Sequence, residues 1–304
     1  MFHQIKLIPK ENQALIAASG AVILWSTVAV AFKLGLKGLA PVQLLFAGSA
    51  ISWVFFALLA AQRRCWWIAD GERRLVVSLG LLNPLAYYLF LFEAYARLPA
   101  QIAQPLNYTW AIVLAILAVP LLGQQLTRRT ATGITVSYGG AVWLVSSHPV
   151  TPGIPLDRFG ILLALVSTFI WSLYWLLNAR SRSDALAVVF WSFTVAVPAL
   201  GVLCALGPGW PPLTQHTLVY GAWVGLIEMG LAFLLWQRAM RLTVQAARIG
   251  QLIFISPFLS FVLIDHVLGE PVGPRSVAAL AIIVVGLIIT GMPNTANRVV
   301  EPRN

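Results

Sequence analysis

Polar and aromatic side chains recur at helical spacing inside otherwise apolar segments of this chain. Between residues 100 and 122, Gln101, Gln104 and Tyr108 fall at positions i, i+3 and i+7, which share one face of an α-helix. Asn107 and Trp110 widen that face. Amide groups can hydrogen-bond the polar head of a small amphiphilic molecule, and aromatic rings can stack on its ring. The pattern therefore predicts a binding face rather than a catalytic centre.

Three further apolar segments carry stripes of the same kind. Their members are Asn83, Tyr87 and Tyr88 in the third segment, Ser167, Trp171, Tyr174 and Asn178 in the sixth, and Gln245, Arg248 and Gln251 in the ninth. With Trp25 in the first segment and Glu228 in the eighth, these residues are candidates for lining one shared cavity. A second interpretation stays open, because amides in membrane helices often bond only to neighbouring helices and tryptophans often lie in interfacial belts.

Glu228 stands near the middle of an apolar segment, where an unpaired carboxylate would be strongly disfavoured. It must therefore be protonated, paired or hydrated. Two interpretations follow. In the first, Glu228 exchanges a proton or binds an ammonium group. In the second, it makes a structural hydrogen bond to a neighbouring helix.

Proline marks the places where these segments can bend, because it has no N–H to donate to the preceding turn. Pro84, Pro105 and Pro257 fall inside apolar segments and adjoin the polar faces. We expect helix kinks at these residues, and a bend there could open or close a cavity.

The elements that must position these residues are membrane-spanning helices. The chain has 304 residues, of which 59% are hydrophobic and 10% charged, whereas a soluble domain carries about 25% charged residues. A bilayer core about 30 Å thick needs roughly 20 apolar residues per helix. Ten such runs can be marked, at residues 13–36, 41–61, 75–96, 100–122, 130–147, 159–179, 185–206, 217–239, 246–267 and 274–292. The predicted fold is an all-α membrane protein with ten transmembrane helices.

Basic residues predict the orientation of these helices. If the N-terminus is cytoplasmic, fifteen of the twenty basic residues fall on the cytoplasmic side, and the other side keeps Lys33, Lys37, Arg97, Arg158 and Arg275. Such an excess marks the cytoplasmic side, so we expect both termini there. Lys33 is expected to extend to the outer headgroups. The net charge of +10 comes from residues standing singly or in pairs at helix ends, so it does not indicate a nucleic-acid partner.

The chain also repeats itself. Trp25-Ser26 recurs as Trp171-Ser172, and Gly140 recurs as Gly286, in both cases 146 residues later. Each half contains five apolar segments, and because five is odd the second copy must enter the bilayer in the opposite orientation, as in many secondary transporters. The expected organisation is two inverted five-helix repeats around a central cavity: a cytoplasmic N-terminus (1–12), the first repeat (13–147), a periplasmic linker (148–157), the second repeat (158–292) and a cytoplasmic C-terminus (293–304).

A recognisable set of residues is spread over the second half: Gly221, Leu231, Ala232, Leu235-Trp236, Ala239, Ala246-Ala247, Pro257 and Gly269-Glu270. This set resembles the hallmark of the drug/metabolite transporter superfamily, in its ten-helix EamA-type branch. The first half repeats the set more loosely and ends in Gly123-Gln124. Within the branch, the run Asn107-Tyr108-Thr109-Trp110 and the paired Trp25 and Trp171 resemble the YddG-type aromatic amino acid exporters of bacterial inner membranes.

The resemblance implies a secondary transporter that exports amino acids, aromatic ones and other small amphiphilic metabolites among them, by alternating access. It implies a central cavity walled mainly by the third, fourth, eighth and ninth helices, with the first and sixth contributing. The expected partners are a small-molecule substrate and the lipid bilayer of the bacterial inner membrane. Two driving forces stay open: the substrate's own gradient, or exchange for protons. A monomer without a cofactor is expected.

Several chemistries have no motif in the chain. There is no G-x-x-x-x-G-K-[ST], no H-E-x-x-H and no G-x-S-x-G, and the four histidines are scattered, so we expect neither an enzyme nor a metal site. Two alternatives stay open. A carrier for a phosphorylated sugar or a drug-like compound would need basic residues in the cavity, for which Arg248 is the one candidate. A membrane enzyme would need an acid, base or metal cluster, and a passive subunit would need none of these.

Overall fold

The computed structural model describes residues 9–122, 127–147, 157–243, 249 and 252–291, and these residues form helices and connecting turns without a β-strand. Seven helical stretches are long and apolar enough to cross a membrane: Lys10–Leu36, Pro41–Arg63, Arg73–Arg97, Ala100–Leu121, Arg158–Asn178, Ala185–Leu206 and Gln215–Met240. Leu252–Leu268 and Pro274–Thr290 are shorter apolar helices. The protein is therefore a multi-pass membrane protein, as the composition predicts.

Several of these stretches are broken into shorter helices. In chain order the elements are α1 (Lys10–Ser26), α2 (Val28–Leu36), α3 (Pro41–Arg63), α4 (Arg73–Gly80), η1 (Leu81–Ala86), α5 (Tyr87–Arg97), α6 (Ala100–Tyr108), α7 (Trp110–Leu122), α8 (Arg128–Ser147), α9 (Arg158–Asn178), α10 (Ala185–Leu206), α11 (Gln215–Ala222), η2 (Trp223–Ala232), α12 (Phe233–Leu242), η3 (Leu252–Ile255), α14 (Ser256–Leu263), η4 (Ile264–Leu268) and α15 (Pro274–Gly291).

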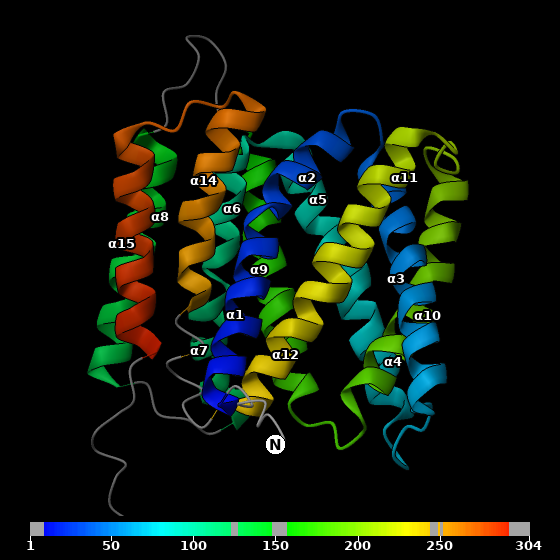
Figure 1. Ribbon diagram of the computed structural model, residues 1–304. Coiled ribbons are helices and arrows are strands. Elements are labelled where there is room, and N and C mark those ends of the chain that lie inside the picture. The colour runs from blue at the N-terminus through cyan, green and yellow to red at the C-terminus, as the bar shows by residue number, and fades with distance from the viewer. Residues whose placement is uncertain (1–8, 123–126, 148–156, 244–248, 250–251, 292–304) are drawn as a thin grey trace, which may run out of the picture.

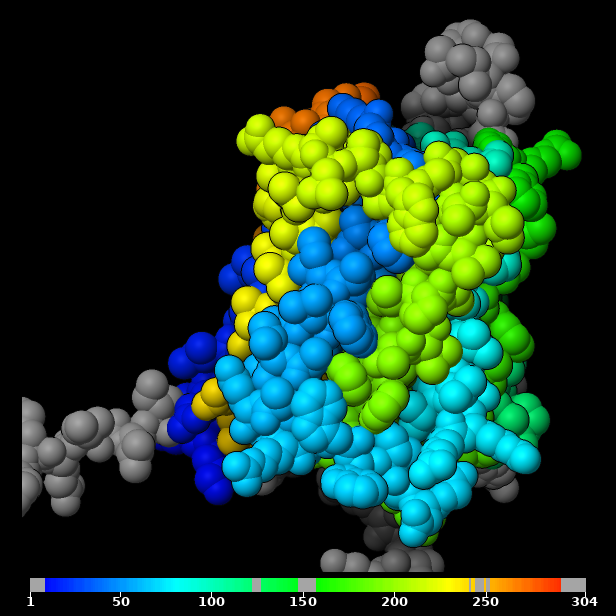
Figure 2. Space-filling view, turned by 90° about the vertical axis from the view of Figure 1, so that its right-hand side faces the viewer, coloured from blue at the N-terminus to red at the C-terminus, as the bar shows by residue number. Residues whose placement is uncertain are grey.

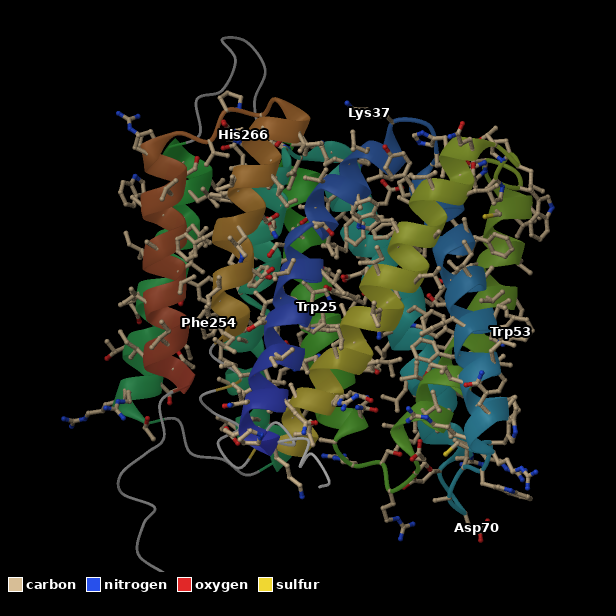
Figure 3. The ribbon with its side chains drawn as sticks, in the orientation of Figure 1. Trp25, Lys37, Trp53, Asp70, Phe254 and His266 are labelled. Carbon is tan, nitrogen blue, oxygen red and sulfur yellow. The ribbon has the colours of Figure 1, made fainter. Side chains whose placement is uncertain are left out.

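The helices stand side by side between two ends of the bundle, an upper end near Lys37 and His266 and a lower end near Asp70 (Figures 1 and 3). α8 and α15 form one flank, and α3, α10 and α11 form the opposite flank (Figure 1). α8 begins at the lower end and α15 at the upper end, so the two run antiparallel (Figure 1). The flank of α3 and α10, which Figure 2 faces, exposes large apolar side chains that suit contact with lipid: Trp53, Val54, Leu58, Trp191, Val202, Leu203 and Leu206.

Small residues allow α8 and α15 to approach closely. A methyl group added to Gly286 would collide with the Ser137 hydroxyl and with the backbone of Gly133. Gly140 packs against Ala279 in the same manner, since a Cβ there would lie 3.0 Å from the Ala279 carbonyl oxygen. The Ser137 hydroxyl donates to the carbonyl oxygen of Ile283 (2.8 Å). Membrane helices associate through such small-residue contacts and interhelical hydrogen bonds.

A second pair of close contacts joins the two halves on the other flank. Gly48 of α3 lies against Gly225 of η2, and Ser52 donates its hydroxyl hydrogen to the Gly225 carbonyl oxygen (2.8 Å). Gly80, the last residue of α4, lies against Ser192 of α10, where a Cβ would come 2.7 Å from the Ser192 carbonyl oxygen. On this flank α3 thus packs directly on η2, and α4 packs directly on α10.

Proline and the residue before it explain two of the helix breaks. In η1, Asn83 precedes Pro84 and leaves the helical region (φ −144°, ψ 121°), because a following proline disfavours helical φ and ψ. In the fourth stretch, Pro105 gives no N–H to the preceding turn, and α6 ends three residues later at Tyr108. The hydroxyl of the next residue, Thr109, donates to the Leu106 carbonyl oxygen. Pro257 lies in the first turn of α14, directly after η3, where the helix changes from 3-10 to α geometry.

At the lower end, Glu72 ties the turn before α4 to the turn after α9. Its carboxylate accepts hydrogen bonds from the Ser183 hydroxyl (2.6 Å), the Arg182 amide (2.8 Å) and the Ser181 hydroxyl (2.8 Å). These bonds favour the ionised form and lower the pKa of Glu72 to about 2. The loops of the two halves are thus joined by a carboxylate that stays charged through the physiological range.

At the upper end, Lys33 has a structural role in place of the expected contact with headgroups. Its ammonium donates to the carbonyl oxygens of Tyr95 (3.1 Å) and Leu98 (3.0 Å), where α5 ends, and lies 3.7 Å from Glu270 Oε1. Glu270 Oε2 in turn accepts from the amide of Ala100, the first residue of α6. A cation suits the negative end of one helix dipole, and a carboxylate suits the positive end of the next.

Candidate binding cavity

The core of the bundle contains a cavity of about 340 Å³, within the range of small-molecule sites. It is walled by α1, α2, η1, α5, α6, α7 and α9, and from the other side by α10, η2, α12 and η3. Trp25, labelled near mid-height on α1, and Phe254, below α14, are two of its wall residues (Figure 3). Both halves of the chain therefore contribute to one cavity.

Most of the residues expected at a binding face line this cavity. They are Trp25, Asn83, Tyr87, Tyr88, Gln104, Asn107, Tyr108, Trp110, Trp171, Tyr174 and Glu228, and the kink residue Pro84 lies among them. Gln245, Arg248 and Gln251 lie outside the described residues. That the lining residues bind a substrate remains a prediction; the structure brings them together around one space.

Gln101 was expected to line the cavity, but it is not among the residues of the cavity wall. Its side-chain amide nitrogen donates to the Pro271 carbonyl oxygen (3.2 Å), and its side-chain oxygen accepts from the Ser276 hydroxyl (3.2 Å). Both partners belong to the turn and helix that follow η4. Gln101 lies one turn closer to the helix end than Gln104, so it meets this turn, and its role is to hold α6 against α15.

An aromatic cluster centred on Trp171 forms part of the wall. The Trp171 ring stacks on Tyr87 (centroids 4.3 Å apart, 27° between planes) and on Tyr174 (5.6 Å, 23°). Trp110 and Trp175 meet it edge-on, at 6.4 Å and 5.6 Å. Stacked and edge-to-face pairs are the favoured geometries of aromatic rings, so the cluster is a stable surface on which a further ring can pack.

Among the described residues that line the cavity, Glu228 is the one with an acidic side chain. Its Oε1 accepts a hydrogen bond from the Tyr88 hydroxyl (3.1 Å), while Oε2 is buried without a hydrogen-bond partner in the described structure. Glu228 belongs to η2, where the helix widens to π geometry, a feature frequently found at functional sites.

A chain of hydrogen bonds crosses the wall beside Glu228. The Tyr87 hydroxyl donates to Asn107 Oδ1 (3.2 Å), and Asn107 Nδ2 donates to the Ser167 hydroxyl (3.1 Å). Ser167 passes its hydrogen to the Ala164 carbonyl oxygen (2.7 Å). This network fixes the orientation of the Tyr87 ring, which stacks on Trp171.

Several polar atoms of the wall have no partner in the described structure. These are Asn83 Oδ1, Gln104 Oε1, Trp175 Nε1 and Glu228 Oε2, each buried. An unsatisfied buried polar group costs about 1–3 kcal/mol, so such groups are normally bonded to water or to a ligand. All four belong to residues of the same wall, which makes them candidates for bonding the polar head of a bound molecule.

Several wall residues were not predicted from the sequence, chiefly large apolar ones: Phe32, Tyr95, Trp175, Val189, Phe193, Met229, Phe233, Trp236, Ile253 and Phe254. An apolar side chain in a membrane helix gives the same pattern whether it faces lipid or a cavity. The spacing of Trp175 four residues after Trp171 was the available signal, because i and i+4 share a helix face. Val189 and Phe193 show that α10 also contributes to the wall.

The described residues contain no group of three or more histidine, cysteine or acidic side chains that could hold a metal ion. An all-helical, multi-pass bundle whose two halves enclose a small, aromatic and sparsely charged cavity is the architecture of a membrane transporter for small solutes. The chain belongs to the EamA-like transporter family, which it matches twice, over residues 12–146 and again over residues 158–292.

Relatives of the chain fit this assignment. It is 29% identical over 202 residues to an uncharacterized protein of Pseudomonas aeruginosa, a match that covers 66% of this chain and 68% of that protein. It is 27% identical over 201 residues to an uncharacterized transporter of Clostridium kluyveri, covering 64% of each, and 22% identical over 271 residues to an uncharacterized transporter of Archaeoglobus fulgidus, covering 88% and 95%. A solved crystal structure shares the fold with a TM-score of 0.65 at 22% identity, over 91% of this chain and 96% of that one.

Proposed function

We propose that the protein is a secondary transporter that exports small amphiphilic solutes bearing an aromatic ring, aromatic amino acids among them, across the bacterial inner membrane. The observation that carries this proposal is the cavity in the core of the bundle, whose wall combines the Trp171 aromatic cluster with residues that bear buried, unpartnered polar atoms. Rings on the wall suit a ring on the substrate, and the unpartnered atoms suit its polar head. One chain encloses the cavity, so a monomer would suffice.

Alternating access is the proposed mechanism, with the halves 13–147 and 158–292 as inverted repeats. Two contacts support the repeat. The Ser26 and Ser256 hydroxyls lie 3.4 Å apart, and the Ser172 hydroxyl donates to the Trp110 carbonyl oxygen (2.7 Å). Ser172 is the counterpart of Ser26 in the second half, and Ser256 is the counterpart of Trp110, both 146 residues later. The contact between Ser26 and Ser256 is therefore equivalent to the contact between Ser172 and Trp110. A pseudo-two-fold axis requires this behaviour, and rocking of one half against the other would expose the cavity to each side in turn.

The proposed orientation places the lower end of Figure 1 in the cytoplasm. The segments at residues 63–74 and 178–185 lie at that end and carry six basic residues: Arg63, Arg64, Arg73, Arg74, Arg180 and Arg182. An excess of basic residues marks the cytoplasmic side. In this orientation the segment from Lys10 enters the membrane from the cytoplasm, and α15 returns the chain to it.

Counterflow in liposomes tests the proposal. Purified full-length protein is reconstituted into liposomes preloaded with unlabelled tryptophan, and uptake of radiolabelled tryptophan is followed. We expect uptake above that of protein-free liposomes, because a carrier exchanges solute down a counter-gradient without an added energy source. A panel with phenylalanine, tyrosine, alanine and a sugar phosphate would establish the range. If no amino acid exchanges above the protein-free level, the proposed function is wrong.

A further inference from the structure

Glu228 Oε2 is a buried acceptor of the one acidic residue on the described cavity wall, whose other members are aromatic, amide and aliphatic side chains. Its partner oxygen is held by Tyr88, so the free oxygen has a fixed position. A carboxylate in a membrane interior is expensive unless it is protonated or a cation or hydrogen-bond donors accompany it. Nothing in the described wall accompanies Oε2, and a bound cation would.

Two of the three other unpartnered atoms of the wall suit a cationic head, while the third, Trp175 Nε1, is a donor that an ammonium does not satisfy. Asn83 Oδ1 and Gln104 Oε1 are buried acceptors on the same wall. An ammonium group has three hydrogens to donate and no acceptor, so it can satisfy three acceptors at once. Among the described wall residues there is no lysine, arginine or histidine that would pair with a substrate carboxylate.

The rings continue from the carboxylate to the aromatic cluster. Tyr88, which bonds Glu228, meets the Tyr87 ring at 4.7 Å, and Tyr87 stacks on Trp171 at 4.3 Å. A molecule with an ammonium at Glu228 could therefore lay its own ring along the Tyr87–Trp171 surface. The ammonium would also lie beside electron-rich tyrosine faces, which attract cations.

Resting on the proposed function, we propose that the cavity selects its substrate by an ammonium group bound at Glu228, so that aromatic amines without a carboxylate bind at least as well as the corresponding amino acids. Glu228 then binds the positively charged ammonium group, and the aromatic cluster around Trp171 binds the aromatic ring of the substrate.

The test is a binding panel on the purified full-length protein, measured by calorimetry. Its four ligands share one indole ring: tryptamine has the ammonium alone, tryptophan has ammonium and carboxylate, indole-3-acetate has the carboxylate alone and 3-ethylindole has neither. We expect tryptamine to bind as tightly as tryptophan or tighter, and the two ligands without an ammonium to bind at least tenfold more weakly.

Variants assign the effect to Glu228. Glu228→Gln should weaken tryptamine at least tenfold and bring its affinity down to that of 3-ethylindole, and Glu228→Asp should restore part of the difference. Glu93→Gln is the matched control, because Glu93 is a carboxylate of the same bundle that pairs with Arg97 (3.5 Å) away from the cavity wall. Gel filtration and thermal melting establish that each variant is folded.

The outcomes separate the two proposals. If tryptophan binds and tryptamine does not, or if a folded Glu228→Gln binds tryptamine unchanged, selection by ammonium is wrong while the transport proposal stands. If Arg248→Gln weakens tryptophan but not tryptamine, a carboxylate site exists and the inference is likewise overturned. If none of the four ligands binds and none is exchanged in liposomes, the proposed function itself is wrong.

Discussion

The hydroxyl of Ser137 donates to the carbonyl oxygen of Ile283 at 2.8 Å, and these two residues are 146 positions apart, the spacing at which the sequence repeats. A residue that contacts its own counterpart lies on or beside the axis that relates the halves. The neighbouring contacts agree: Gly133 packs against Gly286, and Gly140 packs against Ala279. Ala279 lies 146 residues after Gly133, and Gly286 lies 146 residues after Gly140, so each contact is the counterpart of the other. The seam between α8 and α15 thus supports the proposed two-fold relation.

The seam predicts a contrast between two glycines. Gly286→Ala would push a methyl group into Ser137 and the Gly133 backbone, and such overpacking typically costs about 1–3 kcal/mol. Gly139→Ala is the control, since no atom lies within 4 Å of its Cβ position, and removing a helical glycine there should be neutral or stabilising. Melting temperatures in detergent would measure both. Equal melting temperatures for the two variants would contradict the packing argument.

The aromatic cluster predicts a loss of affinity when its central ring is removed. Each aromatic contact contributes about 0.5–1.5 kcal/mol, or about 2- to 12-fold in affinity. Trp171→Ala should therefore weaken an indole ligand by at least that factor, because it also frees the Tyr87 ring. Trp53→Ala is the control, since Trp53 lies on the lipid-facing flank (Figure 3). Unchanged binding by a folded Trp171→Ala would exclude a stacking role.

Two glutamines on one helix should behave differently. Gln104 lines the cavity with an unpartnered oxygen, so Gln104→Leu should lower ligand affinity with little effect on the melting temperature. Gln101 forms hydrogen bonds with Pro271 and Ser276, so Gln101→Leu should lower the free energy of unfolding by about 1–3 kcal/mol. The melting temperature should fall accordingly, with little effect on ligand affinity. Binding and melting measured on the same samples decide the matter. The reverse assignment would contradict the structure.

The same glutamines show how far the sequence could predict the site. Helical spacing placed Gln104, Asn107 and Tyr108 on one face, and the structure has them on one cavity wall. Spacing could not separate Gln101 from them, because its partners are Pro271, in a turn 170 residues away, and Ser276, in α15. The hydrogen bonds from Lys33 to the Tyr95 and Leu98 carbonyl oxygens could not be predicted from the sequence for the same reason. Helices and their repeat are local properties of the sequence, whereas the partner of each polar group is set by tertiary packing.

We expect Lys33, but not the nearby Lys37, to stabilise the folded protein. Lys33→Met would leave the Tyr95 and Leu98 carbonyls without their cation and Glu270 without its partner, and hydrogen bonds to charged groups contribute about 1.5–3 kcal/mol. Lys37→Met removes an exposed charge one turn further along and should have little effect. A double-mutant cycle of Lys33→Met with Glu270→Gln should show coupling, since the two charges lie 3.7 Å apart. Additive melting shifts would mean that the pair does not interact.

Glu72 predicts a pH dependence of stability at the lower end of the bundle. Hydrogen bonds from Ser183, Arg182 and Ser181 lower its pKa from 4.5 to about 2 in the folded protein. A group whose folded pKa is lowered stabilises the fold fully above its unfolded pKa, and that contribution is lost as the pH falls from about 4.5 towards about 2. Glu72→Gln should therefore melt below the wild type at pH 7, and the gap should shrink as the pH is lowered through this window. Asp70→Asn, a change in the same turn, is the control. A gap that stays constant between pH 7 and pH 3 would show that the charge of Glu72 does not join the two loops.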